Sequence, residues 1–156
     1  MNKPMRVVVY ARTEQPQAEE LVRQMFDLLK FVTANGYTLA GNLQESTGDQ
    51  SANRPRLLEI LEYLRSGKAE AIVVQKLPRI STDPEQLYCY LCDLQDARAK
   101  VLTTDSDIHE DLFHKGVGNR LLSRAARHAL PLPWEEGVRK LRYGSMPVPL
   151  TRTAMP

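Results

Sequence analysis

Three arginines occupy matching places in the sequence, each close to the end of a run of residues that is typical of a β-strand. Arg12 follows the first such run, Arg54 follows the second and Arg79 follows the third. A guanidinium group carries a planar fork of hydrogen-bond donors that matches the oxygens of a phosphate. If the three groups meet, they would form a preorganised clamp for phosphate oxygens. Three unrelated surface charges are the alternative that the spacing leaves open.

The elements that would bring these arginines together are strands alternating with helices. Apolar or β-branched runs cover residues 6–10, 37–43, 71–74 and 100–103. Between and after them, apolar residues recur at helical spacing over 17–34, over 55–65, from Pro84 onward and over roughly 110–129. This alternation predicts an α/β fold with a mostly parallel sheet of four to five strands and helices on both faces. Sites in such sheets lie in loops beyond the carboxyl ends of the strands, which are expected to begin here at Ala11, Gln44, Gln75 and Thr104.

Three short motifs surround the arginines, in order, within roughly residues 5–108. They resemble motifs of the resolvase/invertase family, the serine site-specific recombinases. Tyr10–Arg12 resembles the family's opening Tyr-x-Arg. Glu45–Gly48 and Asn53–Leu57 look like its Asp-x-x-x-Ser-Gly loop and its Asp-Arg-Pro-x-Leu helix start. Val73–Ser81 is similar to its Val-x-x-Lys-Leu-Asp-Arg-Leu-Ser-Arg segment, and the resemblance implies a resolvase-like three-layer sandwich.

The resemblance also implies a chemistry for the arginines. In this family a serine two residues after the first arginine attacks a DNA phosphodiester and forms a covalent phosphoserine link. The arginines neutralise the charge that develops in the transition state. Carried over to this sequence, Arg12, Arg54 and Arg79 match active-site arginines, and Glu45 belongs to the same site.

Three departures from the family pattern argue against recombination. Glu14 stands at the position of the nucleophilic serine, and its carboxylate would repel a phosphodiester. Losing a nucleophile that acts as part of a unit typically removes several orders of magnitude in rate. Pro78 and Thr82 replace an aspartate and an arginine, and one lost transition-state donor costs on the order of 10²–10³ more. We therefore predict a catalytically inactive relative in which Glu14 fills the anion site by pairing with Arg12 or Arg79.

Two other hypotheses stay open. An active enzyme that cleaves and rejoins DNA would need a substitute hydroxyl from Thr13, Ser46, Thr47 or Ser81. The side chain of Thr13 is expected to point to the face of the strand opposite Glu14. A module that binds only proteins would have retained the fold and none of the chemistry.

The charges of the 156 residues are unevenly distributed. The net charge is +2, but eight basic and two acidic residues follow residue 114, so that this part carries +6 and residues 1–114 carry −4. A basic segment behind a mildly acidic body is suited to contact with nucleic acid, although a solvated tail would look the same. The candidate DNA-binding residues are Arg120, Arg124, Arg127, Arg139, Lys140 and Arg142.

The domain organisation follows from length and proline content. Residues 1–130 are expected to form one catalytic-type domain, and residues 131–156 a basic, proline-punctuated tail. The expected partners are DNA, bound weakly, and a second copy or another recombinase, in DNA recombination or mobile-element biology. Trp134 is expected to pack as an anchor for the tail, with contact to a partner as the alternative.

Composition excludes several classes of protein. No apolar run approaches the ~20 residues needed to cross a bilayer, and no signal peptide is recognisable, so the cytoplasm is the expected location. The only two cysteines, Cys89 and Cys92, cannot form a disulfide framework. Their spacing suits a metal site, but no second pair of ligands accompanies them. We expect both side chains to pack in the hydrophobic core, on one face of a helix. No metal or cofactor is therefore expected.

Overall fold

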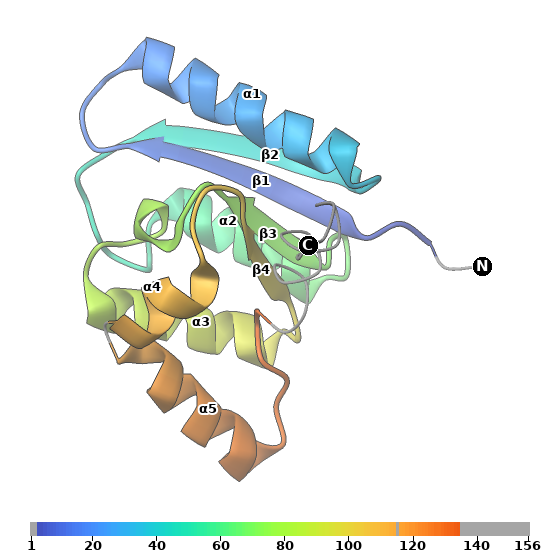
Figure 1. Cartoon of the computed structure of the whole chain (residues 1–156), viewed down its shortest axis with the longest axis vertical. Helices are drawn as coiled ribbons and strands as arrows, with labels where there is room; N and C mark the ends of the chain where they lie inside the picture. The colour runs from blue at the N-terminus through green and yellow to red at the C-terminus, as the bar shows by residue number, and fades with distance from the viewer. Residues whose placement is uncertain (1–2, 115, 135–156) are drawn as a thin grey trace, which may run out of the picture.

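A computed structural model describes residues 3–114 and 116–134 of the chain. Strands and helices alternate along them from the N-terminus (Figure 1). In chain order the elements are β1 (Arg6–Thr13), α1 (Ala18–Ala34), β2 (Thr38–Ser46), α2 (Pro55–Arg65), β3 (Ala71–Val74), the 3-10 turn η1 (Leu77–Arg79), α3 (Pro84–Asp96), β4 (Lys100–Thr103), α4 (Ile108–His114) and α5 (Val117–His128).

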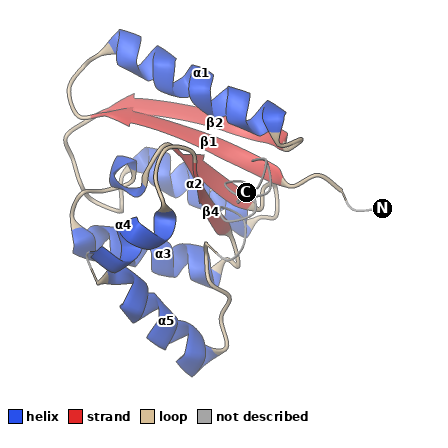
Figure 2. Cartoon of the chain, in the orientation of Figure 1, coloured by secondary structure: helices blue, strands red, loops and turns tan. Residues whose placement is uncertain are grey.

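The sheet is parallel throughout, with the strand order β2-β1-β3-β4. The chain moves outward from β1 first to one side and then to the other. Because each crossover between parallel strands is right-handed, α1 covers one face and α2 and α3 cover the other. Figure 2 shows α1 over β1 and β2, with α2 and α3 on the opposite side. The predicted α/β architecture is confirmed.

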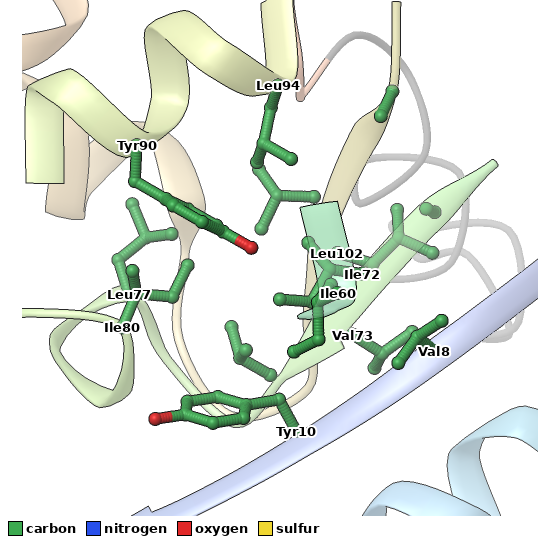
Figure 3. Close-up of a cluster of buried hydrophobic side chains, with 14 of the residues drawn as sticks. Val8, Tyr10, Ile60, Ile72, Val73, Leu77, Ile80, Tyr90, Leu94 and Leu102 are labelled. Atoms are coloured by element: carbon green, nitrogen blue, oxygen red, sulfur yellow. The ribbon is translucent and has the colours of Figure 1, made fainter. Parts of the chain in front are cut away.

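Buried apolar side chains cover both faces of the sheet, with Leu28 and Val32 of α1 on one face and the side chains of α2 and α3 on the other. Figure 3 shows buried side chains of several strands and helices meeting there, among them Val8 of β1, Ile60 of α2, Ile72 of β3 and Tyr90 of α3. Tyr10 of β1 is also completely buried, with its hydroxyl at the border of the cluster. A strand that is covered on both faces has no polar side, which explains the continuous apolar run of β1.

Several element boundaries match the prediction, and two strands are longer than expected. The helix over 55–65 and the strands over 71–74 and 100–103 have the expected bounds, and Asp83 caps α3 by accepting from the backbone N–H groups of Glu85 and Gln86. β1 and β2 stay paired through Arg12↔Glu45 and Thr13↔Ser46. The first two site loops therefore begin at Glu14 and Thr47 and not at Ala11 and Gln44.

The single helix expected over 110–129 is two helices. The chain turns between α4 and α5 at Gly116, whose φ of +75° lies in the left-handed region that glycine adopts readily. Beyond α5, the backbone N–H of Val101 donates to the carbonyl of Pro133 at 2.7 Å. Trp134 is packed, as expected: it is 3% exposed and meets Phe113 edge to face. Residues 135–156 lie outside the described residues.

The prediction that both cysteines fill the core is wrong for Cys89, which is exposed. Cys92 is partly buried and packs against the core. The buried arc of α3 is formed by Leu87, Leu91 and Leu94, and Cys89 lies on the opposite side of the helix. Within the described part of the chain, no helix combines the length and the apolarity that crossing a membrane requires.

Candidate active site

Arg12 lies near the end of β1 and is buried, with 2% of its side chain exposed. It joins β1 to the loop after β2 and to η1 by four hydrogen bonds. Its acceptors are the carbonyl oxygens of Arg79 (2.7 Å), Thr47 (2.8 Å) and Pro78 (3.0 Å) and the Oε1 of Gln50 (3.3 Å). Four of the five N–H donors of a guanidinium are thereby used on the protein itself.

Arg54 immediately precedes α2 and is equally buried. Its Nε donates to Glu45 Oε2 at 3.1 Å, in an ion pair whose carboxylate is 16% exposed. The Nη groups donate to the carbonyls of Asp49 (2.9 Å), Ser51 (3.2 Å) and Ile80 (2.7 Å) and to the hydroxyl of Tyr10 (2.8 Å). All five donors of Arg54 have protein acceptors.

Tyr10 links Arg54 to Glu45. Its hydroxyl accepts from Arg54 and donates to Glu45 Oε2. Burial, and then the hydrogen bond to the Glu45 carboxylate, raise the pKa of Tyr10 far above its usual range. Glu45 therefore lies beside Arg54, another of the predicted site residues, as a partly buried acceptor shared with Tyr10.

Arg79, in η1, is the most exposed of the three arginines, at 23%. Its Nε and Nη2 donate to Gln75 Oε1 at 3.0 and 2.7 Å, and its Nη1 donates to the Arg12 carbonyl at 3.3 Å. Glu20 of α1 lies 3.7 Å from Nη2. Arg79 is therefore the most solvent-exposed of the three arginines, and only one of its hydrogen bonds goes to a backbone carbonyl.

Glu14 and Gln50 lie at the mouth of this cluster. The Glu14 carboxylate is half-exposed and lies 3.9 Å from Arg12 Nη2, at the outer limit of an ion pair. The amide nitrogen of Gln50 donates to Glu14 at 3.1 Å. The Gln50 Oε1 accepts from the Thr82 backbone N–H at 2.8 Å as well as from Arg12. One amide side chain thus bridges Glu14, Arg12 and the segment after η1.

The structure therefore gathers the predicted arginines at the carboxyl edge of the sheet, but with their donors directed at protein acceptors. Burial, and then the neighbouring Arg54, lower the pKa of Arg12. A phosphate oxygen that approached Arg54 would have to displace a protein acceptor, and one that approached Arg12 would find four of its five donors already bound to the protein.

Sequence reasoning missed the glutamines that support the site. Gln24 of α1 is completely buried and clamps the backbone of Arg12, accepting from its N–H at 3.1 Å and donating to its carbonyl at 3.0 Å. A polar residue on the apolar side of a helix, between Leu21 and Leu28, was the available signal. Gln50 and Gln75 lie in loops, where no periodicity marks them.

The alternative hydroxyl nucleophiles differ in accessibility. Thr13 is buried, and its hydroxyl lies 2.9 Å from that of Ser46, whose residue is exposed. Ser81 is 1% exposed and donates to the Gln50 carbonyl at 2.8 Å. The Thr47 hydroxyl accepts from the Asp49 N–H at 3.1 Å. Ser46 is thus the most open of the four.

Two of the predicted DNA-binding arginines are held on α3 by acidic partners. Arg120 pairs with Glu85 at 2.9 Å and lies over the ring of Tyr88, 3.7 Å from its centroid. Arg124 pairs with Asp96 at 2.8 Å. Arg127, in the last turn of α5, is exposed. Arg139, Lys140 and Arg142 lie outside the described residues.

Comparison with known proteins gives a family match and several structural matches. A family model described as the resolvase N-terminal domain matches residues 7–121. The N-terminal catalytic domain of TP901-1 integrase is 17% identical and has a TM-score of 0.61, over 79% of this chain and 99% of that one. A resolvase family site-specific recombinase from Streptococcus pneumoniae is 19% identical, with a TM-score of 0.59 over 80% and 90%. The C-terminal catalytic domain of IS1535 TnpA, an IS607-like serine recombinase, is 24% identical, with a TM-score of 0.54 over 86% of this chain and 90% of that one.

At these identities the solved structures show a common fold. No curated protein sequence gives a significant match.

Proposed function

The chain belongs to the resolvase N-terminal domain family, and from this membership we propose that it is a recombinase-like domain that no longer cleaves DNA. It would act by associating with DNA or with an active recombinase. The observation that carries the proposal is Glu14, which stands two residues after Arg12 where the family motif has its nucleophilic serine.

The hydrogen bonds of the arginines support the same proposal. A phosphate clamp works through donors that are preorganised and free to meet the developing charge. Arg54 directs every donor, and Arg12 four of five, at acceptors of the protein. The nearby Glu14 carboxylate adds a negative charge that opposes the entry of a phosphodiester.

Exposure to DNA tests the loss of cleavage. Incubated with supercoiled DNA, the protein is expected to yield neither nicked DNA nor a covalent protein–DNA adduct. Glu14→Ser is also expected to stay inactive, because Pro78 and Thr82 still depart from the family pattern. An adduct that disappears in Ser46→Ala or Thr47→Ala would instead establish an active enzyme with a substitute nucleophile.

Inorganic phosphate tests the state of the arginines without requiring a DNA target. We expect the Nε–H resonance of Arg79 to shift on phosphate titration, because 23% of its side chain is exposed. The Nε–H resonances of Arg12 and Arg54 should stay in place, because each of these side chains is only 2% exposed. The measurement is a nitrogen–proton correlation spectrum of labelled protein, with chloride at equal ionic strength as the control. Saturable shifts of all three resonances would contradict the proposal.

DNA association should be weak and strongly dependent on salt, since it would rest on phosphate contacts alone. Arg127→Ala is expected to reduce the slope of log K against log salt concentration by about 0.9. Arg124→Ala should change the slope less, because Arg124 is already paired with Asp96. Fluorescence anisotropy with a labelled duplex measures both slopes. If the two substitutions change the slope equally, the ion pair with Asp96 does not prevent Arg124 from contacting DNA phosphates.

A further inference from the structure

Within residues 3–114 and 116–134, β2 is the outermost strand on one side of the sheet. No strand of the described residues pairs with the side of β2 that faces away from β1. From Gly41 to Ser46 the strand is regularly paired with β1, so that alternate N–H and C=O groups face outward along this stretch. Proteins usually protect such an edge with lysine or proline, but β2 contains neither. Its one charged side chain, Glu45, points inward to Arg54.

An exposed apolar surface of α1 lies beside this edge. α1 runs along β1 and β2 (Figure 1), and Met25 lines an open groove of about 470 Å³ together with Asn42, Leu43 and Gln44 of β2. Val22 and Phe26 share the side of α1 on which Met25 lies, because residues three and four apart are neighbours on a helix. They are 68% and 65% exposed. The apolar surface of α1 thus extends from Met25, next to β2, to the exposed Val22 and Phe26 beside the outer edge of the sheet.

On the other face, α2 brings both signs of charge to the same groove. Arg56 and Glu59 line it and lie 3.3 Å apart. A twofold axis perpendicular to the sheet would run two β2 strands antiparallel and keep each helix on its own face. The α1 helices of two copies would then adjoin through Val22 and Phe26. Arg56 of each copy would approach Glu59 of the other, so that the surface is complementary to itself.

We propose that two copies of this chain associate through β2, joining their sheets into one continuous sheet with Phe26 at the centre of the α1 contact. A second copy fits better than a strongly acidic or basic partner, because the edge presents a matched pair of charges together with apolar side chains. The inference is independent of whether the site cleaves DNA.

Sedimentation equilibrium of the full chain tests the interface. We expect a dimer whose dissociation constant rises about tenfold or more in Phe26→Lys and in Asn42→Lys. The matched control is Leu122→Lys, which places the same charge on α5 at a side chain that is 39% exposed. Circular dichroism checks that each variant is folded, as the exposure of Phe26 predicts. A chain that stays monomeric, or a dimer weakened by Leu122→Lys and not by Phe26→Lys, would overturn the proposal.

Disulfide trapping tests the antiparallel geometry separately. In a background with Cys89→Ser and Cys92→Ala, Asn42→Cys at the middle of β2 should form a dimer on mild oxidation, because the twofold axis brings two copies of this position together. Asp105→Cys, exposed beyond β4 at the other side of the sheet, is the control. Trapping of Asn42→Cys no faster than Asp105→Cys would exclude pairing through β2.

Discussion

Arg54→Ala should lower the free energy of unfolding by about 3–5 kcal/mol, which is enough to leave many domains of this size largely unfolded. The substitution removes the charged partner of Glu45, whose carboxylate is 16% exposed and would lose its ion pair. It also removes the donors to the carbonyls of Asp49, Ser51 and Ile80. Urea denaturation followed by circular dichroism measures the loss.

Matched substitutions distinguish the buried network from charge alone. Arg56→Ala, two residues later in an exposed i,i+3 pair, should change stability by no more than about 0.5 kcal/mol. Arg54→Lys keeps the charge but cannot supply a planar fork of five donors, so it should remain clearly destabilised. Combining Arg54→Met with Glu45→Leu should cost less than the sum of the two single changes, because no charge is left unpaired. A loss below about 1 kcal/mol in Arg54→Ala would show that solvent replaces its partners.

This network suggests how a recombinase-like site can keep its arginines without keeping its chemistry. A guanidinium that binds three backbone carbonyls holds loops together, and that contribution to stability does not depend on a substrate. Arg12 and Arg54 join the loop after β2 to η1, which are distant in sequence. Under our proposal, selection for a folded domain is enough to preserve both residues after the nucleophile is lost.

The architecture could be predicted because local signals agree along most of the chain. Proline at the first turn of α2 and α3, the Asp83 cap and the apolar runs of β3 and β4 each mark a boundary unambiguously. The signals failed where tertiary structure decides. The left-handed Gly116 interrupts a helical pattern, and the exposure of Val22, Phe26 and Cys89 depends on how far neighbouring elements extend.

The position of the site could be predicted from the sequence, but the hydrogen-bond partners of its arginines could not. Strand ends and motif spacing bring Arg12, Arg54 and Arg79 to one edge of the sheet. The acceptors of Arg12 and Arg54 are mostly backbone carbonyls, and a carbonyl carries no residue-type signal in a sequence. Whether an arginine in a loop faces a ligand or its own backbone therefore depends on loop conformation, which spacing does not specify.

Raising the pH above about 10 should destabilise the domain by up to about 2.7 kcal/mol per pH unit, because Tyr10 and Tyr90 are both completely buried. Burial raises the pKa of each phenol far above its usual range. Below the ordinary phenol pKa, the folded and unfolded chains hold the same protons and pH has no effect through these groups. Above it, the unfolded chain releases two protons that the folded chain retains, so unfolding becomes more favourable as the pH rises. Urea denaturation between about pH 9 and about pH 11 measures the slope.

Single phenylalanine variants assign this slope to its two sources. Tyr90→Phe should remove about half of it, and at neutral pH should cost only about 1 kcal/mol for the lost 2.9 Å hydrogen bond to the Leu57 carbonyl. Tyr10→Phe should remove the other half but cost more at neutral pH, because Glu45 and Arg54 both lose a buried partner. Burial also raises the pKa of the half-buried Tyr37 and Cys92, and their contributions cancel in the difference between each variant and the unmodified chain. If Tyr10→Phe leaves the alkaline slope unchanged, the Tyr10 hydroxyl must reach solvent, and the closed network around Arg54 would be wrong.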